Sequence, residues 1–134
     1  MHLTAEYFDG LTEHLVWWLL EAADGSAIVV ASWFVNGREI ERTFETTLEV
    51  TRIEQCADAL SQLRPIYDGC VDDFPTYRLS VQTGDRTLAT KVHAGLNWPE
   101  DDKLAIDTFM NVWRPIYLDV ERLLAIPGRS KKRR

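Results

Sequence analysis

The sequence predicts one α+β domain: an antiparallel sheet of about five strands, in the order βββαββα, with two helices packed on one face. Two hairpin signals, at Asn36-Gly37 and Gly84-Asp85, each lie between stretches suited to strands. A stretch with apolar residues at helical spacing follows each hairpin. The 134 residues are 46 % hydrophobic, which is enough for a single core. We therefore expect one domain over 1–128 and a disordered tail over 129–134.

The first three strands are expected near 12–22, 26–35 and 38–47. The stretch "TEHLVWWLLEA" has apolar residues on both alternating faces, which favours a strand covered on both faces, although a short buried helix would also fit. "SAIVVASWFV" is rich in β-branched and aromatic residues. After Asn36-Gly37, Ile40 and Phe44 should face one way and the neighbouring glutamates the other.

A helix is expected near 51–67, because Thr51 and Glu54 form a capping-box pattern and apolar residues follow at helical spacing. Pro65 should bend or end it. Strands near 77–83 and 86–94 should form the second hairpin. A last helix near 99–125 should begin at Pro99, and Pro127-Gly128 should close it. Its apolar stripe comprises Ile106, Phe109, Trp113, Ile116, Val120 and Leu123.

The tetrapeptide "RPIY" occurs twice, at 64–67 and 114–117. Each copy follows a hairpin and a predicted helix. This pattern favours a decayed duplication of a ββα unit. In this interpretation each proline bends its helix, each Ile-Tyr pair packs on the sheet, and each arginine pairs with a nearby acid. If the duplication is real, both copies must lie on like elements.

No catalytic or cofactor pattern is present, so we expect neither enzymatic activity nor a cofactor. The histidines His2, His14 and His93 are far apart in the sequence, and no phosphate-binding glycine loop or CxxC motif occurs. Cys56 and Cys70 are not spaced like a metal knuckle. The acidic loop around Asp68, Asp72 and Asp73 lacks the alternating ligands of a calcium loop, which favours a solvated loop.

Charge is divided unevenly along the chain. The whole chain has 15 basic and 21 acidic residues. The end "RSKKRR" holds five of the basic residues, so the remainder has 15 − 5 = 10 basic residues against 21 acidic ones, a net charge of −11. Such a body repels nucleic acid and membrane phosphates and attracts basic partners. The tail is expected to be solvated, with a nucleic-acid-binding or import role as the alternative.

Three acidic groups and one tryptophan are the candidate partner-binding residues. Each acidic group also has a local explanation: charge that guards an edge strand, a turn, and acids at a helix start. These local roles do not require a net charge of −11. The candidates are Glu39, Glu41, Glu45, Asp68, Asp72, Asp73, Trp98, Glu100, Asp101 and Asp102, and the pair Trp17-Trp18 is a further aromatic candidate.

In size, acidity and sheet-plus-helix layout the chain resembles the immunity proteins that bacteria make against secreted and contact-dependent toxins. The resemblance implies an inhibitor that binds a cognate toxin, often a basic nuclease, as a monomer or homodimer. The alternatives are a phage-type DNA mimic that blocks a nucleic-acid enzyme, and a small-molecule-binding or catalytic domain. The start of the sequence lacks a signal-peptide pattern and no apolar run could span a membrane, so we expect a cytoplasmic protein that binds no membrane.

Overall fold

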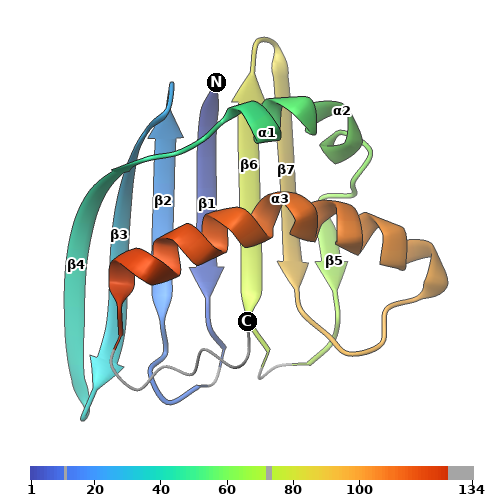
Figure 1. Cartoon of the computed structure of the whole chain (residues 1–134). Helices are drawn as coiled ribbons and strands as arrows, with labels where there is room; N and C mark the ends of the chain where they lie inside the picture. The colour runs from blue at the N-terminus through green and yellow to red at the C-terminus, as the bar shows by residue number, and fades with distance from the viewer. Residues whose placement is uncertain (11, 72–73, 127–134) are drawn as a thin grey trace.

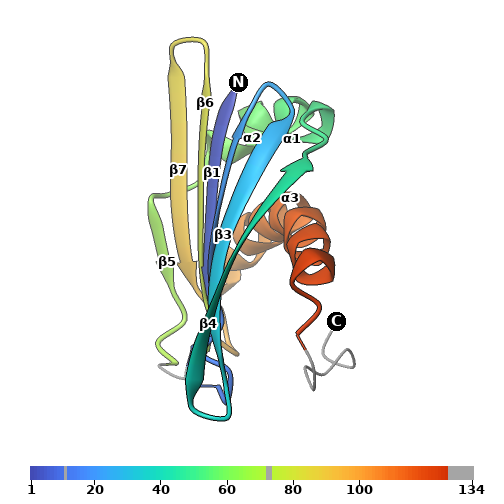
Figure 2. The same cartoon turned by 90° about the vertical axis from the view of Figure 1, so that its left-hand side faces the viewer.

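The chain forms one seven-stranded sheet with its helices on one face (Figure 1). The computed structural model describes residues 1–10, 12–71 and 74–126. The sheet order is β4-β3-β2-β1-β6-β7-β5, and all neighbours are antiparallel except β5 and β7. Figure 2 shows the three helices on the same side of the sheet. The elements are β1 (His2–Phe8), β2 (Trp17–Ala23), β3 (Ser26–Val35), β4 (Arg38–Thr47), α1 (Thr51–Gln55), α2 (Ala57–Leu60), β5 (Ile66–Asp68), β6 (Thr76–Thr83), β7 (Arg86–His93) and α3 (Glu100–Leu124).

Both predicted hairpins are confirmed. Asn36 and Gly37 have φ of 53° and 76°, the conformation that a two-residue turn needs to match the strand twist. This turn brings β4 back along β3 with Val35 opposite Arg38. Gly84 also has a positive φ, and it joins β6 to β7. The strand pairs on which the prediction depended are therefore present.

The prediction of five antiparallel strands is wrong in two places. β1 lies between β2 and β6 at the centre of the sheet and joins the two hairpins into one layer. β1 was not among the expected strands, although its residues Leu3, Ala5 and Tyr7 alternate in the way that is typical of a strand, and all three are buried. β5 has three residues and pairs in parallel with β7. The strand expected from residue 12 begins at Trp17. Leu15, two residues before it, has a positive φ, which an extended strand does not allow.

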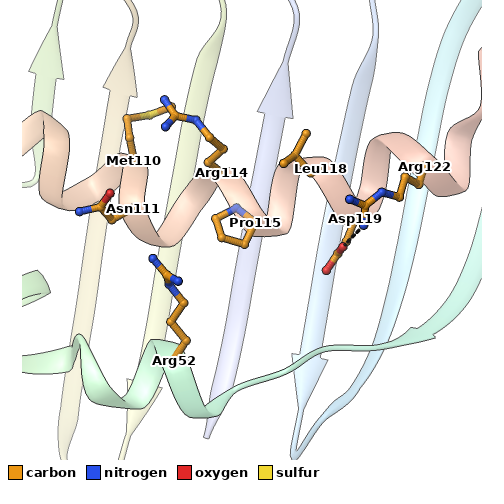
Figure 3. A pocket seen from close by; sticks show the side chains of 8 residues that line it. All are labelled: Arg52, Met110, Asn111, Arg114, Pro115, Leu118, Asp119 and Arg122. Atoms are coloured by element: carbon orange, nitrogen blue, oxygen red, sulfur yellow. Dashed lines mark hydrogen bonds and ion pairs between the residues drawn. The ribbon is translucent and has the colours of Figure 1, made fainter. Parts of the chain in front are cut away.

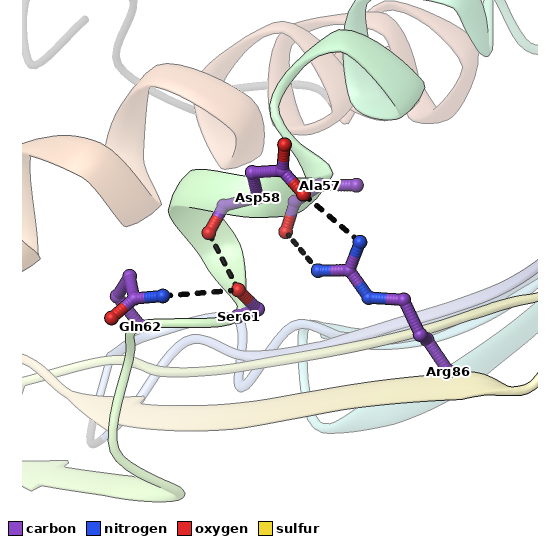
Figure 4. Close-up of polar contacts among 5 residues, drawn as sticks. All are labelled: Ala57, Asp58, Ser61, Gln62 and Arg86. Carbon is purple, nitrogen blue, oxygen red and sulfur yellow. Dashed lines mark hydrogen bonds and ion pairs between the residues drawn. The ribbon is translucent and has the colours of Figure 1, made fainter.

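The helix expected near 51–67 is two short helices, α1 and α2, that end at Leu60. The predicted capping box is absent, since no side chain caps α1 and the Glu49 carboxylate instead accepts the Thr51 amide at 3.0 Å. α2 is fastened to the start of β7 by Arg86, which donates to Asp58 at 2.9 Å and to the Ala57 carbonyl at 3.4 Å (Figure 4).

The two RPIY segments lie on unlike elements, so the predicted duplication is wrong. The first copy follows α2 and enters β5, whereas the second lies inside α3, which includes Pro115 and continues to Leu124. Their arginines also differ. Arg64 pairs with Asp102 at 3.1 Å and covers the Tyr67 ring, whereas Arg114 has no ion pair among the described residues. Identical tetrapeptides thus adopt different structures because their tertiary surroundings differ.

The core lies between α3 and the inner face of the sheet. The predicted apolar stripe of α3 is confirmed: Leu123 is half-buried, and its other members are buried. Trp113 stacks on Trp18 of β2 with ring centroids 5.5 Å apart, and Phe109 lies 5.8 Å from Trp113. α3 crosses the sheet from the β5 side toward β3 (Figure 1). The helices of the described residues therefore pack on one face, and none of them covers the opposite face.

Candidate protein-binding surface

The open face is the side of the sheet that no described helix covers (Figure 2). Five apolar side chains from three neighbouring strands meet there. The exposed fraction is 50 % for Ile28, 40 % for Val30 and 39 % for Phe8. Leu19 lies opposite Val30, and Trp17 lies opposite Phe8, both half-buried. We call Phe8, Trp17, Leu19, Ile28 and Val30 the apolar strip. Contiguous exposed apolar surface of this kind is typical of interaction sites.

Three glutamates of β4 lie on the same face of the sheet as the apolar strip. Strand alternation places Glu39, Glu41 and Glu45 on the open face, as predicted, while Ile40 and Phe44 face the core. Glu45 lies directly opposite Ile28 of the strip. All three side chains are exposed, and none has an ion pair within the described part of the chain. We call them the acidic row. Along the strand, Glu39 and Glu41 are about 6.7 Å apart, and Glu41 and Glu45, with Thr43 between them, are about 13 Å apart.

The other half of the open face is polar and partly cationic. Glu6 bridges the two halves, since it accepts a hydrogen bond from the Trp17 indole at 2.8 Å and lies 3.8 Å from Arg78. A shallow depression of about 270 Å³ opens here, lined by Glu6, Phe8, Thr76, Arg78 and Lys91. Charge therefore changes sign across the face, from carboxylates on β4 to Arg78 and Lys91 on β6 and β7.

Asp68 lies at the opposite edge of the sheet from the acidic row. β5 places it beside His93, with the Asp68 carboxylate 3.1 Å from the His93 Nδ1. The Cys70 amide donates to the same carboxylate at 2.8 Å, and this bond, followed by the His93 contact, lowers the pKa of Asp68. Asp72 and Asp73 lie outside the described residues.

The acids at the start of α3 lie on the helix side of the sheet. Glu100 pairs with Lys103 at 2.8 Å, and Asp102 pairs with Arg64. Asp101 is exposed, and Trp98 is half-buried against the core. The candidate residues chosen from the sequence thus do not form one surface. Only the β4 glutamates share the open face with the apolar strip at the β3 side, where Glu45 lies opposite Ile28. The strip itself was not predicted, because its members are spread over three strands.

Two further polar features of the structure have local roles. The Tyr7 hydroxyl donates to the buried Asp9, and the Thr12 hydroxyl donates to the same carboxylate at 2.6 Å, so β1 is tied to the loop that follows it. His14 lies 3.0 Å from the Phe34 carbonyl, and no group of three potential metal ligands occurs within residues 1–10, 12–71 and 74–126.

A second depression, of about 310 Å³, lies between α1 and α3 (Figure 3). Arg52 comes from α1, and Arg114 and Arg122 come from α3. Arg122 pairs with Asp119 at 3.0 Å. Figure 3 shows Arg52 and Arg114 on different sides of α3, so their guanidinium groups do not converge on one point. This depression is consequently a weaker candidate site than the open face.

No family model matches the chain, and no curated protein matches it in sequence. No helix among the described residues is both long enough and apolar enough to cross a membrane.

Proposed function

We propose that this chain is a protein-binding inhibitor of the immunity type, and that it recognises a basic protein through the acidic row and the apolar strip. One observation carries the proposal: three exposed carboxylates without ion pairs among the described residues lie on the same uncovered sheet face as an exposed apolar surface, and one of them, Glu45, adjoins it directly. Protein interfaces commonly combine a central apolar contact with a polar rim, and this arrangement has both parts.

The two parts would contribute differently to binding. Carboxylates at the rim attract a basic partner over several ångströms and raise the association rate. Buried apolar and aromatic contacts slow dissociation, and Trp17 is the largest side chain available for this on the open face. The acidic remainder of the chain, with a net charge of −11, adds long-range attraction of the same sign.

The apolar strip and the form of the two depressions favour this proposal over the two alternatives. A DNA mimic replaces phosphates and needs carboxylates across its contact surface, whereas here exposed aliphatic side chains of β3, Ile28 and Val30, lie next to the acidic row. A small-molecule site would be an enclosed pocket. The two depressions described above are open to the exterior and do not lie between sheet and helices.

The direct test is protection of bacteria against a toxin. The product of the neighbouring gene is expressed from an inducible promoter, with and without this chain, and growth is measured. The parent should restore growth and bind the purified toxin. Replacing Glu39, Glu41 and Glu45 by lysine should slow association by about tenfold or more at low salt, and the difference should shrink at high salt because exposed charges are screened.

A charge-matched control separates local from global electrostatics. Glu54, Asp85 and Asp107 are exposed acids that lie away from the acidic row and have no ion pair among the described residues. Reversing these three changes net charge equally and should affect association much less. Equal effects of the two triple variants would assign the attraction to net charge alone. Full protection by the acidic-row variant would contradict the proposed surface.

A further inference from the structure

β4 is a long strand with no described neighbour on its outer side. It has ten residues, and it forms one end of the sheet order. An edge strand carries a row of backbone N–H and C=O groups that can pair with another strand. The turn before β4 determines which of its residues direct these backbone groups outward.

The amide groups directed outward belong to the acidic row and Thr43. A two-residue turn makes the pair that flanks it, Val35 and Arg38, a hydrogen-bonded pair, and hydrogen-bonded pairs then alternate along an antiparallel ladder. The backbone groups of Ile40, Arg42 and Phe44 therefore point toward β3. Those of Glu39, Glu41, Thr43 and Glu45 point away from it. In agreement, the Glu41 carbonyl accepts a hydrogen bond from the Arg42 guanidinium at 2.7 Å.

The side chains of β4 define what a pairing strand must contain. On the open face, the acidic row favours lysine or arginine at the opposite positions, because opposite charges across a strand pair are favourable. On the inner face, Ile40 and Phe44 pack against the core but remain half-buried. Apolar side chains beside them would complete the burial of this edge. The complementary strand thus alternates basic and apolar residues.

A second copy of this chain is a poor occupant of the same edge. Antiparallel self-pairing centred on Glu41, Arg42 or Thr43 keeps the two acidic rows on one face. The first register sets Glu41 opposite Glu41, the second sets Glu39 opposite Glu45, and the third sets Glu41 opposite Glu45. Like charges directly opposite are unfavourable. The acidic row therefore disfavours pairing of β4 with a second copy of β4, and it favours pairing with a basic strand.

We propose that the partner binds by adding such a strand, with alternating basic and apolar residues, to the outer edge of β4. This inference rests on the proposed function, because it names the element by which a basic partner would be recognised. Backbone pairing would supply the register, and the acidic row would supply the selectivity.

The test uses a synthetic nine-residue peptide in which lysine and valine alternate. A peptide of the same composition, with lysines and valines in separate blocks, is the control. Amide hydrogen exchange is followed by NMR in the full chain. At saturation, the alternating peptide should slow exchange at Glu39, Glu41, Thr43 and Glu45 by about tenfold or more, because these amides gain partners.

One substitution separates strand addition from charge attraction. Thr43→Pro removes an outward donor and keeps all three glutamates, and proline is tolerated on an edge strand where its nitrogen faces outward. It should weaken binding of the alternating peptide about tenfold, whereas Thr43→Ala should stay within about twofold of the parent. Thermal melting checks that both variants fold. If Thr43→Pro does not fold, the amide exchange of the parent with the two peptides still tests whether a strand is added to β4.

Three results would overturn the inference: equal binding of both peptides with fast outward amides, unchanged binding by Thr43→Pro, or binding of neither peptide near β4. After either of the first two results, the proposed function would still hold if the acidic-row variant binds the toxin more weakly than the parent does. The proposed function itself would be contradicted by a different result: full protection in the growth assay by the acidic-row variant.

Discussion

Trp17 and Trp18 are neighbours in the sequence and lie on opposite faces of β2. Trp18 is fully buried and stacks on Trp113 of α3. Trp17 is half-buried on the open face, where its indole nitrogen donates to Glu6. The same residue type therefore contributes to the core on one face and remains partly exposed on the other. Apolar content alone therefore does not define the core, because the described helices cover only one face of this sheet.

The largest expected effect is on the covered face. Trp113→Ala removes the ring that packs against Trp18, Phe109 and Tyr77, and it should lower the free energy of unfolding by about 3–5 kcal/mol. Trp17→Ala should cost less than half of this. Urea unfolding of both variants measures the difference. Equal losses would show that the open face is as tightly packed as the core.

A second, smaller contrast uses two consecutive residues of β3. Val29 is buried on the inner face, and Val30 is 40 % exposed on the open face. Val29→Ala should destabilise the fold by about 2 kcal/mol, on the area-based estimate for buried methyl groups. Val30→Ala should stay within about 0.5 kcal/mol of the parent. Binding to the toxin should rank the two variants in the reverse order, and calorimetric titration would detect a failure of that ranking.

A smaller effect is expected for an ion pair on the helix side of the sheet. Arg64 and Asp102 form a pair on the helix side in which the Asp102 side chain is 13 % exposed. A double-mutant cycle with Arg64→Ala and Asp102→Asn should give a coupling of roughly 0.5–1 kcal/mol, the upper part of the range for surface pairs. Coupling should fall as salt is added. A coupling free energy of zero at low salt would show that this ion pair does not contribute to stability.

The smallest effect concerns Asp68 on the open face. The Cys70 amide, and then His93, hold the pKa of Asp68 below its ordinary value. A carboxyl with a lowered folded-state pKa stabilises the fold above its unfolded-state pKa, and this contribution disappears as pH falls through the folded-state value. Asp68→Asn should therefore be slightly less stable than the parent at neutral pH and equal to it in strong acid. A difference that is constant with pH would rule out a role for the ionised carboxylate.

The local pattern of the sequence predicted most elements correctly. The Asn36-Gly37 turn, the alternation in β4, and the apolar stripe of α3 are short-range features, because each depends on residues within one or two turns of the chain. The same logic placed Glu39, Glu41 and Glu45 together on one face. It did not predict the place of β1, whose pattern was present but whose partners are β2 and β6.

What the sequence determined by itself was thus the type of the long elements, the face of each side chain within its strand, and the acidic character of the body. Only the tertiary structure decided how strands far apart in the sequence pair, and hence that Phe8, Trp17 and Ile28 share one exposed strip. It also decided that one RPIY copy enters a strand and the other stays in a helix. The physical reason is that local preferences amount to a few tenths of a kcal/mol to about 1 kcal/mol per residue, whereas burial against a particular neighbour can exceed them.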